Sequence, residues 1–258
     1  MPRDWFAGWV LAFAANCAAA GSVTVAVAAN MLTPMQAIAK RFEQDTGHTV
    51  ALTAGATGKL YAQITHGGPW QLLLAADDTT GPRLIQEGRG VAASHHIYAL
   101  GRLALWNASS NGASDGPQVL RRGEFAYLAI ANPRVAPYGA AAVQVLQALG
   151  LPHLATPTSP AQKPQLVLGE SVAQAYQFVA TGHATWGFVA LSQVMQEGRI
   201  ARGSAWVVPG HLHSPLRQGV VLLKPGENHA AAQALLAYLQ SPAAQQVLRQ
   251  FGYDLPSP

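Results

Sequence analysis

Short apolar segments alternate with amphipathic segments along the first third of the chain. Residues 22–29 (SVTVAVAA) carry β-branched side chains at alternating positions, which predicts a strand. Residues 32–46 have apolar side chains at helical spacing and are followed by Gly47, which predicts a helix with a glycine after its last turn. The two patterns recur as predicted strands at 48–54 and 71–76 and predicted helices at 59–65 and 80–87. This strand–helix order favours a mainly parallel sheet with helices on both faces.

A second α/β series lies between two longer extended segments, residues 96–106 and 216–223. The pattern between them predicts a loop at 107–117, strands at 127–131, 165–168 and 185–189, and helices at 139–149, 172–181 and 191–197. Two further helical segments, separated by Ser241-Pro242, complete the chain. The economical interpretation is an α/β protein of two lobes joined by two crossover strands.

The two extended segments also predict the lobe boundaries. We expect residues 21–101 and 216–258 to form lobe one, because the C-terminal helices return to it after the second crossover. Residues 102–215 are then expected to form lobe two. No internal repeat or low-complexity tract divides the chain further.

Residues 1–20 differ from the rest and are predicted to be a cleaved secretory signal peptide. An apolar stretch at 6–15 precedes the small residues Ala18-Ala19-Ala20, as at a signal cleavage site, and is too short to span a membrane. The mature protein is therefore expected in the periplasm. A tethered N-terminal helix and a lipid anchor on Cys17 are the alternatives. Cys17 is the single cysteine of the chain, so disulfides and thiolate metal sites are not expected.

Composition narrows the kind of partner. Half of the 258 residues are hydrophobic and only 11% are charged, which excludes a disordered chain. Sixteen Lys and Arg against twelve Asp and Glu give a net charge of +4, without a polybasic run. This modest excess favours anionic ligands and falls short of a nucleic-acid-binding surface.

Four turns that lead from a strand into a helix are the candidate ligand-binding segments. A helix start offers backbone N–H groups without intrahelical partners and about half a positive charge, which suits an oxyanion. The four turns lie at 28–31, 54–59, 132–139 and 169–172. Taken singly, residues such as Asn30 or Ser171 are better explained as ordinary helix caps, and only the convergence of several turns favours an anion site. Two turns from each lobe, facing across a cleft, are expected to surround a small tetrahedral anion.

Several segments resemble the periplasmic molybdate-binding proteins of ABC importers, in order along nearly the whole mature chain. They are VAVAANM (25–31), FEQDTGHTV (42–50), AGATGKLYAQI (54–64), LLLAAD (72–77), IYALGRLALW (97–106), IANPRVAPYG (130–139) and SPAAQQVLRQFGY (241–253). The resemblance implies a two-lobed type II periplasmic-binding-protein fold that closes over molybdate or tungstate. It further implies a binding protein without enzymatic activity or cofactor, acting as a monomer and delivering its ligand to a membrane permease.

The resemblance also implies the ligand contacts. They fall on Ala29, Asn30, Ala56, Thr57, Tyr138 and the backbone N–H of Val172. There are departures from the family pattern: Ala190 stands where some members have a ligand-binding tyrosine, which Tyr138 is expected to replace, and Ala56 and Gln71 stand where serine and an acidic residue are common. No residue is expected to ligate a metal ion directly.

Charged groups near these turns have other expected roles. Lys59 is a possible countercharge, but on its helix it is expected to point to solvent. Glu170 is the nearest carboxylate that could accept a proton from a ligand such as hydrogen phosphate. A site of neutral donors alone favours a fully deprotonated oxyanion.

Other functions fit less well. The segment 55–60 lacks the glycine and hydroxyl residue that a P-loop requires at positions 53 and 60, and 169–173 lacks the closing glycine of a nucleophile elbow. The histidine pairs His95-His96 and His211/His213 lack the further ligands of a zinc site. A two-lobed α/β transferase would need a general base that none of the four turns offers. A binding protein for sulfate or another tetrahedral oxyanion stays an alternative.

Overall fold

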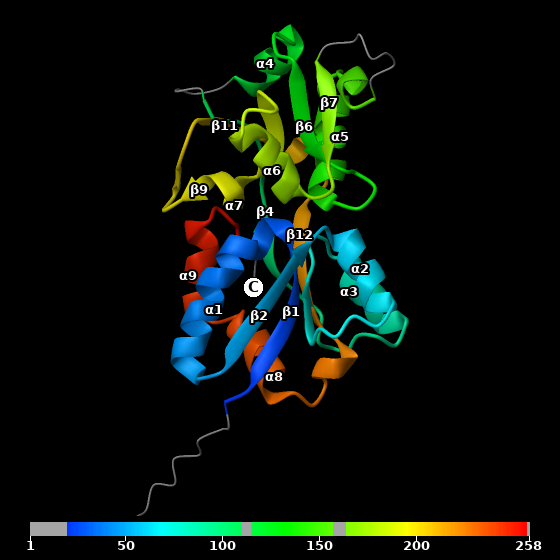
Figure 1. Cartoon of the computed structure of the whole chain (residues 1–258), viewed down its shortest axis with the longest axis vertical. Helices are drawn as coiled ribbons and strands as arrows, with labels where there is room; N and C mark the ends of the chain where they lie inside the picture. Colours follow the sequence, from blue (N-terminus) through cyan, green and yellow to red (C-terminus); the bar gives the residue numbers. More distant parts are fainter. Residues whose placement is uncertain (1–19, 110–114, 157–163, 257–258) are drawn as a thin grey trace, which may run out of the picture.

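The computed structural model describes residues 20–109, 115–156 and 164–256. Two five-stranded sheets, each flanked by helices, lie one above the other along the long axis of the molecule (Figure 1). Residues 1–19 of the predicted signal peptide, Cys17 among them, lie outside the described residues. Among the residues described, no helix is long and apolar enough to cross a membrane.

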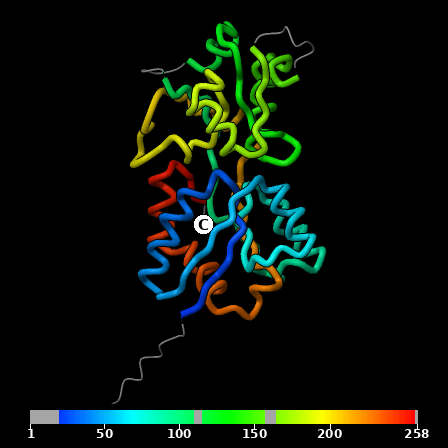
Figure 2. The backbone as a smooth tube through the Cα atoms, viewed as in Figure 1, coloured from blue at the N-terminus to red at the C-terminus, as the bar shows by residue number. Residues whose placement is uncertain are grey.

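The first sheet takes its strands from both ends of the chain. Its strands are β1 (Ser22–Ala28), β2 (Thr49–Gly55), β3 (Leu72–Leu74), β4 (His96–Gly101) and β12 (Leu216–Leu222), in the spatial order β2-β1-β3-β12-β4. Its helices are η1 (Ala29–Met31), α1 (Leu32–Thr46), α2 (Thr57–Thr65), α3 (Thr80–Gln86), η4 (Lys224–Gly226), α8 (Ala230–Tyr238) and α9 (Pro242–Gln250). Helices α1, α8 and α9 cover one face and α2 and α3 the other (Figures 1 and 2).

The second sheet is built from one continuous part of the chain. Its strands are β5 (Leu103–Asn107), β6 (Tyr127–Ala131), β7 (Gln165–Gly169), β8 (Trp186–Ala190) and β11 (Ser204–Val207), in the order β11-β5-β8-β6-β7. The remaining elements are α4 (Gly116–Arg122), α5 (Pro137–Ala148), η2 (Pro152–Leu154), α6 (Val172–Ala180), α7 (Leu191–Val194), η3 (Gly210–Leu212) and the hairpin β9 (Met195–Gln196) and β10 (Arg199–Ile200).

The chain crosses between the sheets twice. The predicted extended segment 96–106 is two strands, β4 and β5, which meet at Arg102 and belong to different sheets. The return crossing lies between β11 and β12. Strand β12 is antiparallel to β3 and β4, and β5 is antiparallel to β8 and β11, whereas the other pairs within these two sheets are parallel. Each sheet is therefore mixed, with four strands in one direction and one strand, β12 or β5, running against them, so the prediction of mainly parallel sheets with helices on both faces is confirmed. The exact ends of the two lobes stay a prediction.

Alternation along β1 explains how the first lobe is packed. Val23, Val25 and Val27 are buried against α1, α8 and α9, in one core with Phe42. Ala26 points to the other face and packs with α2. Gly47 adopts the predicted left-handed conformation, with φ of 75°, and its N–H donates to the carbonyl of Glu43. Burial on both faces is what the continuous apolar character of this strand requires.

Some elements differ from the sequence prediction. The helix predicted at 191–197 is the short α7, because the chain turns at Glu197 and Gly198, both with positive φ, and pairs β9 with β10. Helix α4 was not predicted: it begins inside the expected loop, and the Asp115 side chain accepts from the N–H of Gln118 at its start. Strand β11 was also missed, because its four residues pair only with one edge of β5.

Candidate functional site

Four helix starts, two beside each sheet, converge on one small cavity of about 10 Å³. All six residues predicted as ligand contacts line it: Ala29, Asn30, Ala56, Thr57, Tyr138 and Val172. Five further residues complete the lining: Ala28, Gly55, Ala76, Ala136 and Pro137. Four of these five, Ala28, Gly55, Ala136 and Pro137, lie inside the predicted turns, and Ala76 lies just after the end of β3, outside them.

The cavity is lined by the first residues of the helices. Ala29, Thr57 and Val172 are the first residues of η1, α2 and α6, and Tyr138 is the second residue of α5. Backbone N–H groups at these positions have no acceptor within their own helix. The positive ends of the helix dipoles add attraction for an anion. No charged side chain is among the described residues that line the cavity.

The hydroxyl of Thr57 is anchored on one side. Thr57 is buried, and its Oγ1 accepts the N–H of Ala76 at 3.0 Å. Ala76 lies just beyond β3, so the hydroxyl is fixed against the end of that strand. A hydroxyl that accepts one hydrogen bond still has its own proton to donate. Thr57 thus combines a backbone and a side-chain donor at the same helix start.

The Asn30 side chain has a different role from the one expected. Asn30 was expected to cap the helix or to contact the ligand, but both protons of its side-chain amide have partners inside the protein. Nδ2 donates to Gln218 Oε1 and to the hydroxyl of Tyr253, each at 2.8 Å. Asn30 is buried, so its side chain ties the turn to the body of lobe one. The donor it leaves for a ligand is its backbone N–H.

The phenol of Tyr138 reaches the crossover. Its hydroxyl is buried and makes no hydrogen bond with the residues that the structure describes; it lies beside Gly101 at the end of β4 and near the side chain of Gln218. Burial, followed by the neighbouring Tyr253, raises the pKa of Tyr138 well above its usual value, so the phenol is protonated at neutral pH. Ala190 is buried at the end of β8, and its N–H donates to Gln193 Oε1 at 3.0 Å.

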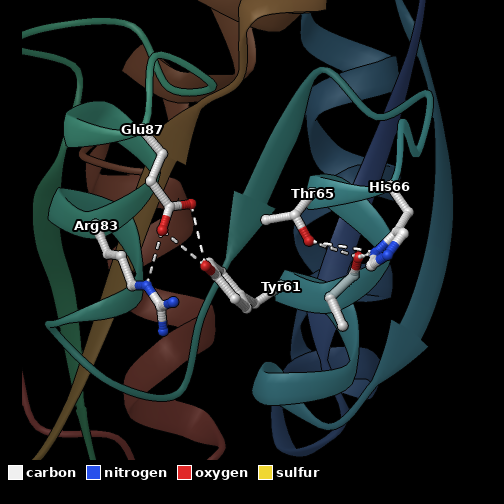
Figure 3. Close-up of polar contacts among 6 residues, drawn as sticks. Tyr61, Thr65, His66, Arg83 and Glu87 are labelled. Atoms are coloured by element: carbon white, nitrogen blue, oxygen red, sulfur yellow. Dashed lines mark hydrogen bonds and ion pairs between the residues drawn. The ribbon is translucent and has the colours of Figure 1, made fainter.

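A network of side chains holds α2 against α3 behind the site (Figure 3). The Tyr61 hydroxyl donates to Glu87 at 2.8 Å, Arg83 Nε donates to the same carboxylate at 2.9 Å, and the Arg83 guanidinium lies 4.2 Å from the centre of the Tyr61 ring. The hydrogen bonds from Tyr61 and Arg83 lower the pKa of Glu87. These contacts fix the helix whose first residue is Thr57.

Two contacts connect the lobes beside the cavity. The N–H of Gly58 donates to the carbonyl of Val135 at 2.9 Å. Lys59 Nζ lies 2.7 Å from Glu170, with side-chain exposures of 46% and 73%. Lys59 was expected to point to solvent. Its long side chain is half exposed but ends on Glu170, so both charges are neutralised outside the cavity.

Removing this ion pair should have a small effect on ligand binding. An exposed pair is worth about 0.2–1 kcal/mol and is screened by salt. We expect Lys59→Met and Glu170→Gln each to weaken ligand binding less than about fivefold at low salt, and less at high salt, as measured by calorimetry. Lys40→Met, on the exposed face of α1, is the control for lost charge. A large loss that salt does not reduce would mean that Lys59 neutralises the ligand directly.

A larger groove of about 690 Å³ opens next to the cavity, between α2, α3 and residues 133–137. Asp77, Asp78, Arg83 and Arg134 line it, so it offers charges of both signs. It shares only Ala136 and Pro137 with the small cavity. The described residues contain no group of three or more His, Cys, Asp or Glu placed to hold a metal ion.

A two-lobed fold whose helix starts surround a small cavity between the lobes is typical of proteins that bind a small solute. Comparison of the sequence with known proteins leads to the same class. The chain belongs to the bacterial extracellular solute-binding proteins, whose family profile matches residues 23–254. It is 52% identical over 240 residues to the molybdate-binding protein ModA of Azotobacter vinelandii, covering 93% of this chain and 92% of that protein. It is 44% identical over 237 residues to ModA of Rhodobacter capsulatus, covering 92% and 89%.

A solved structure supports the same family assignment. The periplasmic molybdate-binding protein of Azotobacter vinelandii superimposes with a TM-score of 0.85 at 34% identity, covering 91% of this chain and 100% of that chain. The likeness confirms the type II two-lobed fold and the family resemblance that the sequence motifs indicated. The relatives are binding proteins, which confirms the expectation that this chain is not an enzyme.

Proposed function

We propose that this protein captures molybdate in the cleft between its lobes and delivers it to the membrane permease of an ABC importer. The observation that carries the proposal is the convergence of four helix starts, two from each lobe, on one small cavity without a charged lining residue. The names of the two relatives at 52% and 44% identity support the same ligand.

Neutral donors can hold a dianion in such a place. A buried ion must have its oxygens hydrogen-bonded, since each unpaired buried polar group costs about 1–3 kcal/mol. Backbone N–H groups at the helix starts and the Thr57 hydroxyl supply donors from several directions, and the helix dipoles add attraction. Because donors from both lobes are needed, binding favours the arrangement in which the lobes are in contact.

The same donors discriminate by protonation. A ligand that still carries a proton needs an acceptor, and none of the lining residues offers a carboxylate. Glu170, the nearest candidate, is paired with Lys59 outside the cavity. Molybdate and tungstate, which are fully deprotonated at neutral pH, should therefore bind in preference to phosphate. Sulfate meets the same chemical requirement and differs in size, so it is the alternative ligand.

The further parts of the proposal concern location and partners. We propose that the protein works in the periplasm as a monomer, without a cofactor, after residues 1–20 have been removed as a signal peptide. A lipid anchor at Cys17 is the alternative. The family to which the chain belongs is extracellular, which supports export.

Isothermal titration calorimetry tests the ligand directly. We expect tight binding of molybdate and tungstate at one site, much weaker binding of sulfate, and no binding of phosphate. Calorimetry is preferable to intrinsic fluorescence because Trp70, Trp106, Trp186 and Trp206 do not line the cavity. Equal affinity for sulfate and molybdate would contradict the ligand assignment, and turnover of a phosphoryl donor would contradict the class of protein.

A further inference from the structure

A buried polar network lies directly behind the oxyanion cavity. Its members are Asn30, Ser192, Gln218 and Tyr253, with exposed fractions of 2%, 5%, 0% and 3%. Of these, only Asn30 lines the cavity. Burying four polar side chains is costly unless each finds a partner, so the hydrogen bonds among them must be specific.

The hydrogen bonds form a consistent set. Asn30 Nδ2 donates to Gln218 and Tyr253, while Gln218 Nε2 donates to the carbonyl of Leu216 at 2.8 Å, which fixes the orientation of that amide. Ser192 Oγ donates to the backbone carbonyl of Asn30 at 2.8 Å. The Tyr253 hydroxyl lies 3.1 Å from Ser192 Oγ and has one proton to give. Burial raises the pKa of Tyr253 to about 12, so that proton is present at neutral pH.

The members come from four distant parts of the chain. Asn30 is in the turn after β1, Gln218 is at the irregular step of β12, and Tyr253 follows α9. Ser192 is in α7, directly after β8 of the second sheet. The bond from Ser192 to Asn30 therefore joins the second lobe to the backbone of a ligand-binding turn in the first. The Tyr253 hydroxyl contacts both Ser192 and Asn30, so it completes the junction between the lobes.

We propose that Tyr253 and Ser192 are positioning residues for oxyanion binding: they fix the Asn30 turn and hold lobe two against it, which prolongs the loaded state. This proposal rests on the proposed function. A contact made between the lobes in the loaded state stabilises that state relative to an open one, and the ligand is released only after the contact is lost. The network should thus act mainly on the rate of ligand release.

Two single variants and their combination test the proposal in the full mature chain. Tyr253→Phe and Ser192→Ala each remove one hydroxyl and keep the rest of the side chain. We expect each to weaken molybdate binding about 3- to 10-fold, mostly through faster dissociation in stopped-flow measurements. Because the two hydroxyls share one network, the double variant should lose less than the product of the two effects.

Tyr98→Phe is the matched control. Tyr98 is also a buried tyrosine, on β4, and its hydroxyl has no hydrogen-bond partner among the described residues 20–109, 115–156 and 164–256. We expect it to leave both affinity and dissociation rate unchanged. If Tyr253→Phe and Ser192→Ala lower the stability to urea but leave dissociation as in the unaltered protein, the network is merely structural and the proposal is overturned.

Small-angle X-ray scattering separates this inference from the proposed function. If the unaltered protein binds no molybdate, the proposed function fails. The role of the network in joining the lobes is then tested by the scattering of the ligand-free protein and its variants. Both variants should scatter as a more extended particle than the unaltered chain and Tyr98→Phe. Unchanged scattering in that case would also reject the junction between the lobes.

Discussion

Gly139→Ala should lower the free energy of unfolding by about 1–3 kcal/mol and weaken molybdate binding at least about tenfold. Gly139 lies in the first turn of α5, where a Cβ would overlap the carbonyl oxygen of Ala131 and come within 2.8 Å of the carbonyl carbon. Backbone atoms cannot rotate away, so the helix start must move outward, and the N–H of Tyr138 moves with it. Urea denaturation and calorimetry measure the two effects.

Gly210→Ala is the control for a glycine that can accept a methyl group. No atom lies within 4 Å of a Cβ built there, and the residue lies away from the cavity. We expect both stability and affinity to stay close to those of the unaltered protein. If Gly139→Ala binds molybdate normally, the start of α5 does not contribute to the site.

Thr57→Val should weaken molybdate binding by about 1–3 kcal/mol, or about 5- to 160-fold in Kd. Valine has nearly the same shape as threonine, so the change removes the hydroxyl and adds no bulk. The loss has two sources: one donor to the ligand disappears, and the N–H of Ala76 loses its acceptor next to the cavity. Calorimetry well below the unfolding temperature gives the affinity of the folded variant.

Thr57→Ser separates the hydroxyl from the methyl group. Serine keeps the acceptor for Ala76 and the donor for the ligand, so we expect affinity within a few-fold of the unaltered protein. A folded Thr57→Val variant with normal affinity would remove the Thr57 side chain from the site, and only its backbone N–H would remain as a contact.

Local pattern was sufficient for most of the fold. The helix at 32–46 and the strand at 127–131 were predicted with the bounds that the structure has, because each has a clear apolar period and a sharp end. The second half of the predicted helix at 191–197 was wrong because positive φ at Glu197 and Gly198 forms a hairpin, and this tertiary choice overrides the helical pattern. Edge strand β11 was missed because four residues carry too short a pattern.

The sequence predicts which turns of the backbone meet at the site, but not how the side chains in those turns are oriented. Turns after parallel strands must lie at one end of a sheet, so the four turns at 28–31, 54–59, 132–139 and 169–172 followed from the order of elements. The choice of Ala29, Thr57, Tyr138 and Val172 within those turns came from the family resemblance. The orientation of the Asn30 amide depends on Gln218 and Tyr253, which lie 188 and 223 residues away. Nothing near Asn30 in the sequence reports those partners. The pairing of Lys59 with Glu170 could not be predicted either, because the two residues lie far apart in the sequence.

The position of β12 between β3 and β4 has a consequence for how the newly made protein folds. The second sheet uses only residues 103–207, so it can assemble as soon as that part of the chain is free. The first sheet must wait for residues 216–222, and its helical cover is complete only when α9 arrives. A chain that emerges amino-terminus first therefore finishes its second lobe before its first, and the binding cleft is the last part to form.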